Sequence, residues 1–398
     1  MDTRKNTKTS ALILLFSFTY FISYVTRTNY ATIVSEMVTS LNQPKSALAV
    51  ALTGSFITYG VGQLVSGFFG DRFQPKHLVA VGLVMTCCMN VLIPLCGNTT
   101  QMAIVWCING FAQSFMWPPL VKLMATMLSE ADYNRGCVRV SWGGSLGTMF
   151  VYLVAPLLIT LAGWKSVFFM SAVLGVLGLL LWWKKCPEID MTATPKKNVE
   201  TTGKTRLFSP LLVMALIGIV LQGTLRDGVT TWMPSYIAEE FHFSNEIAIL
   251  VGVILPLFSI VCHQFTELLY EKKLNNMFLC AAVMFGAGAL AALGLYGFAG
   301  KNAALSVAMS AVLAGSMHGV NLLLVCLLPP VIAKGGKVST ISGIMNSCTY
   351  IGSALSTYVI PLAAEQAGWS VTLLLWLGIA ATGALVCGIC IPFWKRLA

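Results

Sequence analysis

Two arginines, Arg27 and Arg226, lie inside long apolar stretches, where a charged side chain is costly. Arg27 lies about sixteen residues into the stretch that begins at Ala11, and Arg226 about sixteen residues into the one that begins near Pro210. At about 1.5 Å per helical residue, this depth is close to the middle of a hydrocarbon layer of about 30 Å. An ionised guanidinium there costs several kcal/mol unless it faces a partner or a cavity. Because guanidinium groups bind oxyanions through paired hydrogen bonds, the two arginines predict an anion-binding site.

The arginines share helical faces with other polar or aromatic side chains. Tyr20, Tyr24 and Arg27 recur at i, i+4 and i+7, and Gln222 lies one helical turn before Arg226. Such a stripe in an apolar helix points toward protein or water and away from lipid. Asp227 follows Arg226, but neighbouring helical residues point about 100° apart. Its position in the sequence therefore does not by itself establish that Asp227 neutralises the arginine.

The composition defines the elements that must hold these residues. The chain of 398 residues is 57% hydrophobic and 10% charged, and its mean hydropathy is +0.78, which is typical of a membrane protein. Apolar runs of helix-spanning length recur throughout, so we expect an all-α membrane protein with twelve transmembrane helices. The expected spans are 11–38, 47–70, 78–96, 101–128, 139–162, 166–183, 209–237, 247–270, 276–299, 302–333, 338–363 and 369–393.

The Lys and Arg residues that give the net charge of +10 are distributed among the loops in a regular way. If the N-terminus is inside, only Lys45, Lys165 and Lys301 fall in outside loops. Nearly all other Lys and Arg residues fall in inside segments. This distribution obeys the positive-inside rule and predicts that both termini are cytoplasmic. The excess charge is therefore topological, and no nucleic-acid partner is expected.

The chain has two similar halves. A polar segment at 184–208 separates an expected six-helix bundle at 1–183 from a second at 209–398, and we interpret it as a cytoplasmic linker. Three features repeat in equivalent helices or loops of the two halves: Arg27 with Arg226, Gly163-Trp164 with Gly368-Trp369, and Pro118-Pro119 with Pro329-Pro330. Such weak repetition is typical of transporters that rock two bundles about a midplane site. Pro118-Pro119 is expected to bend its helix.

Several local motifs resemble the organophosphate:phosphate antiporter family of the major facilitator superfamily. They are Tyr20, Tyr24, Arg27 and Asn29 in the first span, Gly110-Phe-Ala-Gln113 with Trp117-Pro118-Pro119 in the fourth, and Leu225-Arg226 with Trp232-Met-Pro234-Ser-Tyr236 in the seventh. The resemblance covers essentially the whole chain and implies the major facilitator fold. It also implies that Arg27 and Arg226 bind the substrate phosphate and that Asp71 and Arg72 belong to a cytoplasmic gating loop. Together with the polar stripes, it gives the expected substrate-binding set: Arg27, Arg226, Tyr20, Tyr24, Tyr59, Gln63, Gln113, Trp117, Gln222, His318, Asn346 and Tyr350. For the uncharged neighbours, hydrogen bonding between helices is the alternative role.

The chain departs from that family in two respects. Gln63 and Thr28 stand where many members carry lysines; in addition, the stretch Trp142–Gly147 lacks the histidine of glycerol-phosphate exchangers. The expected cavity is therefore less basic, which makes a singly charged or differently shaped anion more plausible than in those members.

The expected function is exchange of an organophosphate, such as a sugar phosphate or glycerol phosphate, for inorganic phosphate by alternating access. One alternative is a proton-coupled organic-anion symporter, with Asp227, His263, Glu267 and His318 as candidate proton carriers. The other is a transport-like sensor of a phosphorylated metabolite. No enzyme motif, metal site or cofactor is expected. We expect a multi-pass monomer in a bacterial cytoplasmic membrane.

Overall fold

The computed structural model describes residues 2–43, 45–191, 210–243, 251–333 and 337–396. Every regular element in these ranges is helical, which confirms the all-α prediction. The chain forms two compact units, one made of 1–203 with 333–347 and the other of 204–332 with 348–398. Most of the expected linker lies outside the described residues, so the predicted domain boundaries stay predictions.

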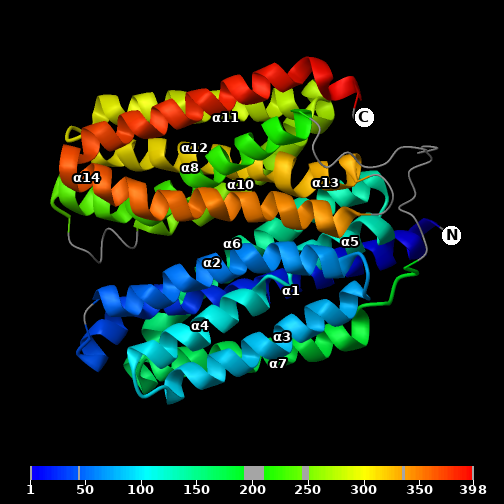
Figure 1. Ribbon diagram of the computed structural model, residues 1–398, viewed down its shortest axis with the longest axis horizontal. Coiled ribbons are helices and arrows are strands. Elements are labelled where there is room, and N and C mark those ends of the chain that lie inside the picture. The colour runs from blue at the N-terminus through cyan, green and yellow to red at the C-terminus, as the bar shows by residue number, and fades with distance from the viewer. Residues whose placement is uncertain (1, 44, 192–209, 244–250, 334–336, 397–398) are drawn as a thin grey trace. The chain divides into compact units, whose positions relative to one another are not determined.

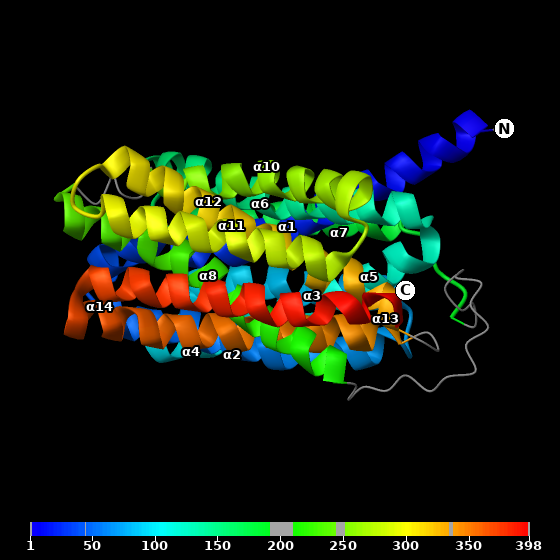
Figure 2. The same ribbon diagram turned by 90° about the horizontal axis from the view of Figure 1, so that it is seen from above.

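The helices of the first unit lie side by side along one direction (Figures 1 and 2). The long helix α1 packs against α6 and α7, while α2 packs on α4 and α3 packs on α7. The bounds are α1 Asp2–Leu41, α2 Lys45–Gly70, α3 Pro75–Leu92, η1 Ile93–Leu95, α4 Thr99–Gln113, α5 Trp117–Met127, α6 Glu130–Ala162 and α7 Lys165–Lys185, with the start of α14 Val338–Cys390.

In the second unit, α12 packs against α8, α10 and α11. The bounds are α8 Pro210–Phe241, α10 Ile254–Leu269, η2 Tyr270–Leu274, α11 Met277–Phe298, α12 Ala303–Asn321, η3 Leu322–Leu327, α13 Leu328–Ile332, the remainder of α14, and η5 Ile391–Arg396. Both η2 and η3 are wide π-helical turns. Residues 247–250 of the eighth expected span lie outside the described residues.

Both proline pairs lie next to interruptions of regular α-helix, and the one at Pro118-Pro119 was expected. Pro118 has no N–H to offer the carbonyl of Ser114, and the chain leaves the α-helix between α4 and α5. In the second unit, the π-helical η3 separates α12 from α13, which contains Pro329 and Pro330. Both breaks therefore have the same local cause.

The repeated Gly-Trp pairs also share one backbone conformation. Gly163, which follows α6, has φ 75° and ψ 170°, and Gly368, within α14, has φ 79° and ψ 171°. Residues with a side chain hardly ever adopt this conformation. Gly368 has non-helical backbone angles and divides α14 into two helical stretches, so the expected eleventh and twelfth spans meet at a break at this residue.

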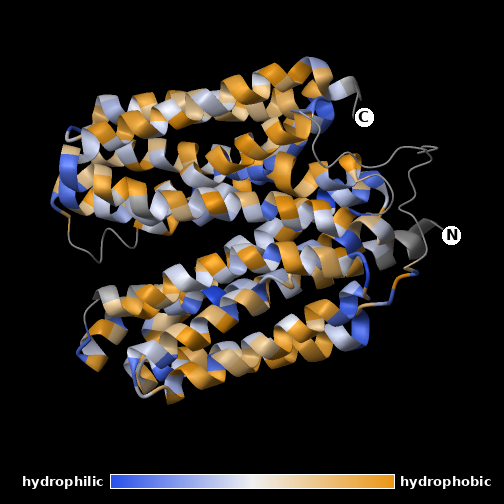
Figure 3. Cartoon of the chain, in the orientation of Figure 1, coloured by the Kyte–Doolittle hydropathy of each residue, from blue (hydrophilic) through white to orange (hydrophobic). Residues whose placement is uncertain are grey.

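The helices are long and apolar enough for a membrane. Eight of the described helical segments satisfy a length and hydropathy criterion for spanning. Hydrophilic residues gather mostly at helix ends, with a few inside the helices (Figure 3). Those interior polar residues form the candidate site.

Candidate functional site

In the first unit, Arg27 lies among aromatic rings. Its guanidinium carbon is 4.2 Å from the ring centre of Tyr24 and 4.9 Å from that of Tyr59. Tyr20 packs between Tyr24 and Trp117 at ring-centre distances of 5.1 and 5.2 Å. Three helices, α1, α2 and α5, therefore bring five predicted site residues into one cluster. Rings at this distance attract a guanidinium through cation–π interaction and restrict its orientation.

Small residues on α6 allow this arrangement. A Cβ at Gly144 would lie 2.9 Å from the Tyr24 ring, and one at Gly143 would lie 2.2 Å from the carbonyl oxygen of Ser17. Because α1 and α6 approach so closely, their contact fixes the face of α1 that carries Arg27. The small residues of this glycine-rich stretch therefore permit the close helix contact.

Gln113 belongs to a buried hydrogen-bond network. Its Nε2 donates to the hydroxyls of Thr26 and Thr86, both at 2.8 Å, and its Oε1 accepts from Ser23 at 2.6 Å. The network continues through other buried polar side chains of α1, α3, α4 and α7, namely Asn29, Asn90, Asn109 and Ser171. Gln113 thus holds helices together in this conformation, and its role as a substrate ligand stays a prediction.

Gln63 lies near the carbonyl that Pro118 leaves without a helical donor. The Ser114 oxygen accepts from Ser66 Oγ at 2.7 Å and from Gln63 Nε2 at 3.4 Å. Gln63 is fully buried, yet its Oε1 has no hydrogen-bond partner among the described residues. The Nε1 of Trp117 is also buried and also has no hydrogen-bond partner among the described residues. Unpaired buried polar groups cost about 1–3 kcal/mol each, so a polar ligand or water is expected beside them.

In the second unit, Arg226 forms a bidentate pair with Asp227. Its Nε lies 2.7 Å from Oδ1 and its Nη2 lies 2.9 Å from Oδ2. Nη1 also donates to Asn321 on α12 at 3.1 Å, and Ser353 on α14 donates a short hydrogen bond to Asp227. Asp227 thus pairs with Arg226, a question that the helical positions of the two residues had left open. Adjacent opposite charges in an apolar helix were the signal for this pair, since each needs a partner.

Gln222 lies one turn before Arg226 on α8 and is fully buried. In the part of the chain that the structure describes, neither its Oε1 nor its Nε2 has a hydrogen-bond partner. A buried amide with both ends unsatisfied is expected to bind a polar ligand or water. Gln222 and Arg226 therefore make a candidate polar site within the second unit.

Two histidines of the second unit lie next to each other. The rings of His263 and His318 are 5.4 Å apart between centres, and His263 Nδ1 donates to the Ser259 carbonyl at 2.6 Å. Glu267, one turn from His263, accepts from Gln264 at 2.7 Å. Three of the four candidate proton carriers thus sit on α10 and α12, which pack together.

Asn346 and Tyr350 are both largely buried on α14. Asn346 belongs to the first unit and Tyr350 to the second. Their roles as substrate ligands stay predictions.

Asp71 connects three elements of the first unit. Its carboxylate accepts from the backbone N–H groups of Ser339 and Thr340, at 3.1 and 2.8 Å, at the N-terminus of α14. Lys122 Nζ on α5 lies 3.4 Å from the same carboxylate. Arg72 instead folds back on its own helix, donating to the Phe68 carbonyl at 3.2 Å. The structure thus gives Asp71 contacts suited to a latch and gives Arg72 only a local contact.

Comparisons with known proteins bear on the family and the fold. Residues 16–357 match the Major Facilitator Superfamily. The structure of the proton:xylose symporter XylE bound to 6-bromo-6-deoxy-D-glucose has a TM-score of 0.79 at 14% identity, covering 99% of this chain and 96% of that one. This likeness shows the fold.

Relatives with curated names include a glycerol-3-phosphate transporter of Bacillus subtilis, 27% identical over 233 residues, or 51% of each chain. A "Probable hexose phosphate transport protein" of Chlamydia muridarum is 26% identical over 40% of this chain and 35% of its own length. The membrane sensor protein UhpC of Escherichia coli is 22% identical over 55% of each. The matches thus span about a third to a half of these relatives. The family match, covering most of the chain, and the all-helical fold identify the chain as a multi-pass membrane protein of the major facilitator superfamily.

Proposed function

We propose that the protein is a secondary transporter that exchanges an organophosphate for inorganic phosphate across a bacterial cytoplasmic membrane. The carrying observation is that each unit holds one arginine inside an apolar helix together with a buried polar side chain that has no hydrogen-bond partner among the described residues, Trp117 in the aromatic cluster of Arg27 and Gln222 one turn from Arg226. The names of the glycerol-phosphate and hexose-phosphate relatives support a phosphorylated substrate. They also support the interpretation of this protein as a transporter and not as an enzyme.

In the first unit, the stacked rings of Tyr24 and Tyr59 hold the Arg27 guanidinium. A cation whose orientation is already restricted loses less entropy when it binds an oxyanion. The Trp117 N–H and the Gln63 carbonyl then offer one donor and one acceptor for the polar groups of the organic part. This combination fits a phosphate ester with hydroxyl groups.

In the second unit, an anion must compete with the Asp227 carboxylate for Arg226. A phosphate group presents similar oxygens and carries up to two charges, so it can replace the carboxylate in the bidentate geometry. We propose that binding requires this replacement, with Gln222 supplying further hydrogen bonds. The carrier then reorients readily only when an anion is bound, which makes transport an exchange.

The test uses purified protein in liposomes loaded with inorganic phosphate. Uptake of labelled glycerol 3-phosphate and glucose 6-phosphate is measured with and without internal phosphate. The exchange proposal expects uptake only with internal phosphate. Uptake of equal rate into liposomes that contain no counter-anion would overturn it.

Arginine's role is tested with Arg27→Lys. Lysine keeps the charge but loses the planar fork, and a hydrogen bond to a charged group contributes about 1.5–3 kcal/mol. Affinity for the anion is therefore expected to fall by about tenfold or more. The matched control is Arg139→Lys, an exposed arginine on α6. Equal loss in both variants would contradict a binding role for Arg27.

Proton-coupled symport is a second candidate, and the Arg226–Asp227 pair favours it. Protonation of Asp227 would release Arg226 for the anion, and His318 and His263 lie near enough to assist. Symport predicts that an inward proton gradient drives uptake without internal phosphate and that Asp227→Asn abolishes this drive. Exchange predicts that Asp227→Asn binds the anion more tightly, because the competing carboxylate is gone. Binding without flux in any condition would instead support a sensor, as the UhpC relative is named.

A further inference from the structure

A long apolar groove runs along the outer face of the first unit between α3 and α7. Its first part has a volume of about 480 Å³ and is lined by residues from His77 to Met85 and from Leu179 to Lys184. A second hollow of about 730 Å³ continues between the same helices, lined from Cys87 to Leu92 and from Phe169 to Leu177. Both helices satisfy the membrane-spanning criterion. The groove therefore faces the hydrocarbon of the bilayer.

The groove has the dimensions of a lipid chain. From His77 to Leu92 is fifteen residues, or about 22 Å along the helix at about 1.5 Å per residue. Val81, Val84 and Leu180 along its walls are about half exposed, and no polar side chain interrupts the apolar lining between its basic end and Cys87. An extended acyl chain fits such a channel, and its contacts would be apolar throughout.

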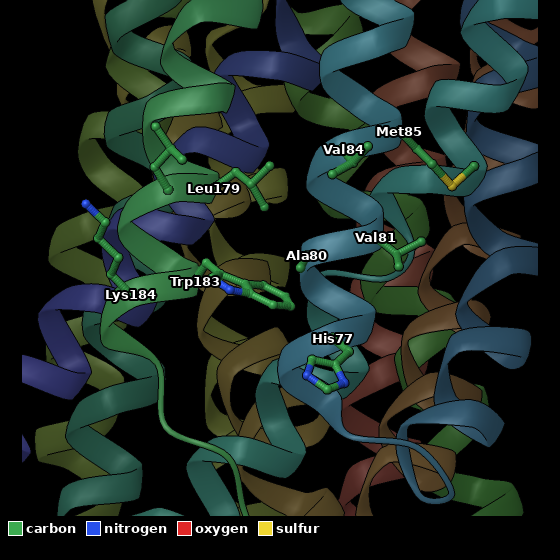
Figure 4. A pocket seen from close by; sticks show the side chains of 9 residues that line it. His77, Ala80, Val81, Val84, Met85, Leu179, Trp183 and Lys184 are labelled. Atoms are coloured by element: carbon green, nitrogen blue, oxygen red, sulfur yellow. The ribbon is translucent and has the colours of Figure 1, made fainter.

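One end of the groove is basic and rigid. Figure 4 shows the Trp183 ring reaching from α7 toward Ala80 and His77 on α3. The rings of Trp183 and His77 stack at 5.5 Å, and Lys76 Nζ lies 5.3 Å from the centre of the Trp183 ring. Trp182 also donates to the Lys76 carbonyl at 3.0 Å, which ties the two helices together. Lys184 also lines this end on the α7 side; its side chain extends away from His77 in Figure 4, and its flexible four-carbon stem can rotate toward a headgroup.

An acidic residue also lies at this end. Glu188 is 3.9 Å from Lys76 Nζ and 3.5 Å from His77 Nε2. It is kept there because the Gln74 amide holds Ile189, donating to its carbonyl at 2.7 Å and accepting from its N–H at 3.4 Å. Glu188 is more than half exposed, so its pairing with these cations is weak and can be displaced.

We propose that this groove binds one acyl chain of an anionic phospholipid, with the headgroup phosphate at Lys76, His77 and Lys184. Basic pockets between transmembrane helices bind anionic headgroups, and each nearby cation strengthens such binding. The sequence predicts that this end is cytoplasmic. The headgroup displaces Glu188, so this carboxylate limits affinity and selects for lipids with more negative charge.

The test measures lipid retention by native mass spectrometry on the full-length, delipidated protein. Phosphatidylglycerol and phosphatidylcholine with identical acyl chains are added at matched concentrations. Phosphatidylglycerol is expected to be retained preferentially, and Lys184→Gln is expected to reduce its retention about fivefold, the effect of one cation near an anionic surface. Glu188→Gln is expected to increase it.

The groove itself is tested with Val84→Trp, which fills the channel. This variant should lose the bound phosphatidylglycerol. Val283→Trp, a similarly exposed valine on α11, and Lys272→Gln, an exposed lysine in η2, should not. If Val84→Trp fails to fold, the Lys184 and Glu188 variants decide the question.

Three outcomes would overturn the proposal. The first is equal retention of the two lipids. The second is retention that Lys184→Gln and Glu188→Gln leave unchanged. The third is a dimer that Val84→Trp dissociates, because a second copy of the chain would then occupy the groove.

Discussion

At the residue scale, Asp71 shows how a buried charge can hold separate helices together. Its side chain is 8% exposed, as is appropriate for a carboxylate with several compensating groups. The two N–H groups at the start of α14 contribute hydrogen bonds and the positive end of a helix dipole, while Lys122 contributes a full charge. Residues far apart in sequence are thus linked through one carboxylate.

A double-mutant cycle tests this linkage. Asp71→Asn leaves the Lys122 ammonium buried without its carboxylate and is expected to lower the free energy of unfolding by about 3–5 kcal/mol. Lys122→Met should cost less, because the two backbone donors still satisfy Asp71. The double variant should be less destabilised than the sum of the single ones, as measured by unfolding in detergent.

Lys273→Met, at an exposed position, is the control and should change stability little. Strict additivity of Asp71→Asn and Lys122→Met would mean that the two side chains do not interact in the membrane protein.

The candidate site was predictable to different extents at this scale. Tyr20, Tyr24 and Arg27 come together because helical spacing alone puts them on one face. For Arg226 and Asp227, the adjacent opposite charges indicated a pair, but the hydrogen bonds that Asn321 and Ser353 add from other helices were not predictable. Likewise, the sequence marks both Gln113 and Arg27 as polar residues in apolar helices. Only tertiary packing determines that Gln113 lies in the buried hydrogen-bond network.

At the element scale, local chemistry accounts for the helix breaks. Proline removes a backbone donor wherever it occurs, so Pro118-Pro119 was expected to disturb its helix, and the equivalent pair Pro329-Pro330 also lies next to a helix interruption. The shape that replaces the helix was not predictable. After α12 it is a π-helical turn of fully buried residues, whereas after α4 it is a short turn whose freed carbonyl accepts from Ser66.

The kink at Gly368 gives a prediction for α14. Alanine at this φ and ψ is strained, so Gly368→Ala is expected to destabilise the protein by about 1–3 kcal/mol. Gly378→Ala, in a regular part of the same helix with open space around the new Cβ, should be neutral or stabilising by about 0.5–1 kcal/mol. The same substitution at two positions of α14 is therefore expected to lower the melting temperature at Gly368 and to leave it unchanged or raise it at Gly378.

The equivalent glycine supplies an internal check. Gly163→Ala should behave like Gly368→Ala, because the two positions have nearly the same backbone angles and open surroundings. A Gly368→Ala protein that melts at or above the parent temperature would show that the kink is not maintained in the membrane.

At the scale of the whole molecule, charge and apolarity are separated along each unit. Apolar residues cover the helices, and hydrophilic residues gather mostly at their ends (Figure 3). The membrane character and the all-helical class follow from the composition, because it is strongly apolar in runs of helix-spanning length. In lipid, an α-helix satisfies all its backbone hydrogen bonds within its own segment. The division of α14 between two compact units did not follow from composition, because it depends on which helices its two ends contact.

The orientation of the molecule is the last prediction. α11 separates a loop at Asn275, which follows Lys272 and Lys273, from a loop at Gly300 next to Lys301. By the positive-inside rule, the first loop and the C-terminus are cytoplasmic and the second loop is outside. Alkaline phosphatase, which is active only outside, should be active when fused after Gly300 and inactive when fused after Asn275. A fluorescent protein at the C-terminus, which matures only in the cytoplasm, should fluoresce.

The loops on the two sides of α11 differ by few charges. Replacing Lys272 and Lys273 with glutamine should therefore weaken the charge asymmetry across α11. It should not reverse the orientation, because the other inside segments still carry most of the positive charge. Phosphatase activity at Asn275 in the parent chain would contradict the whole assignment.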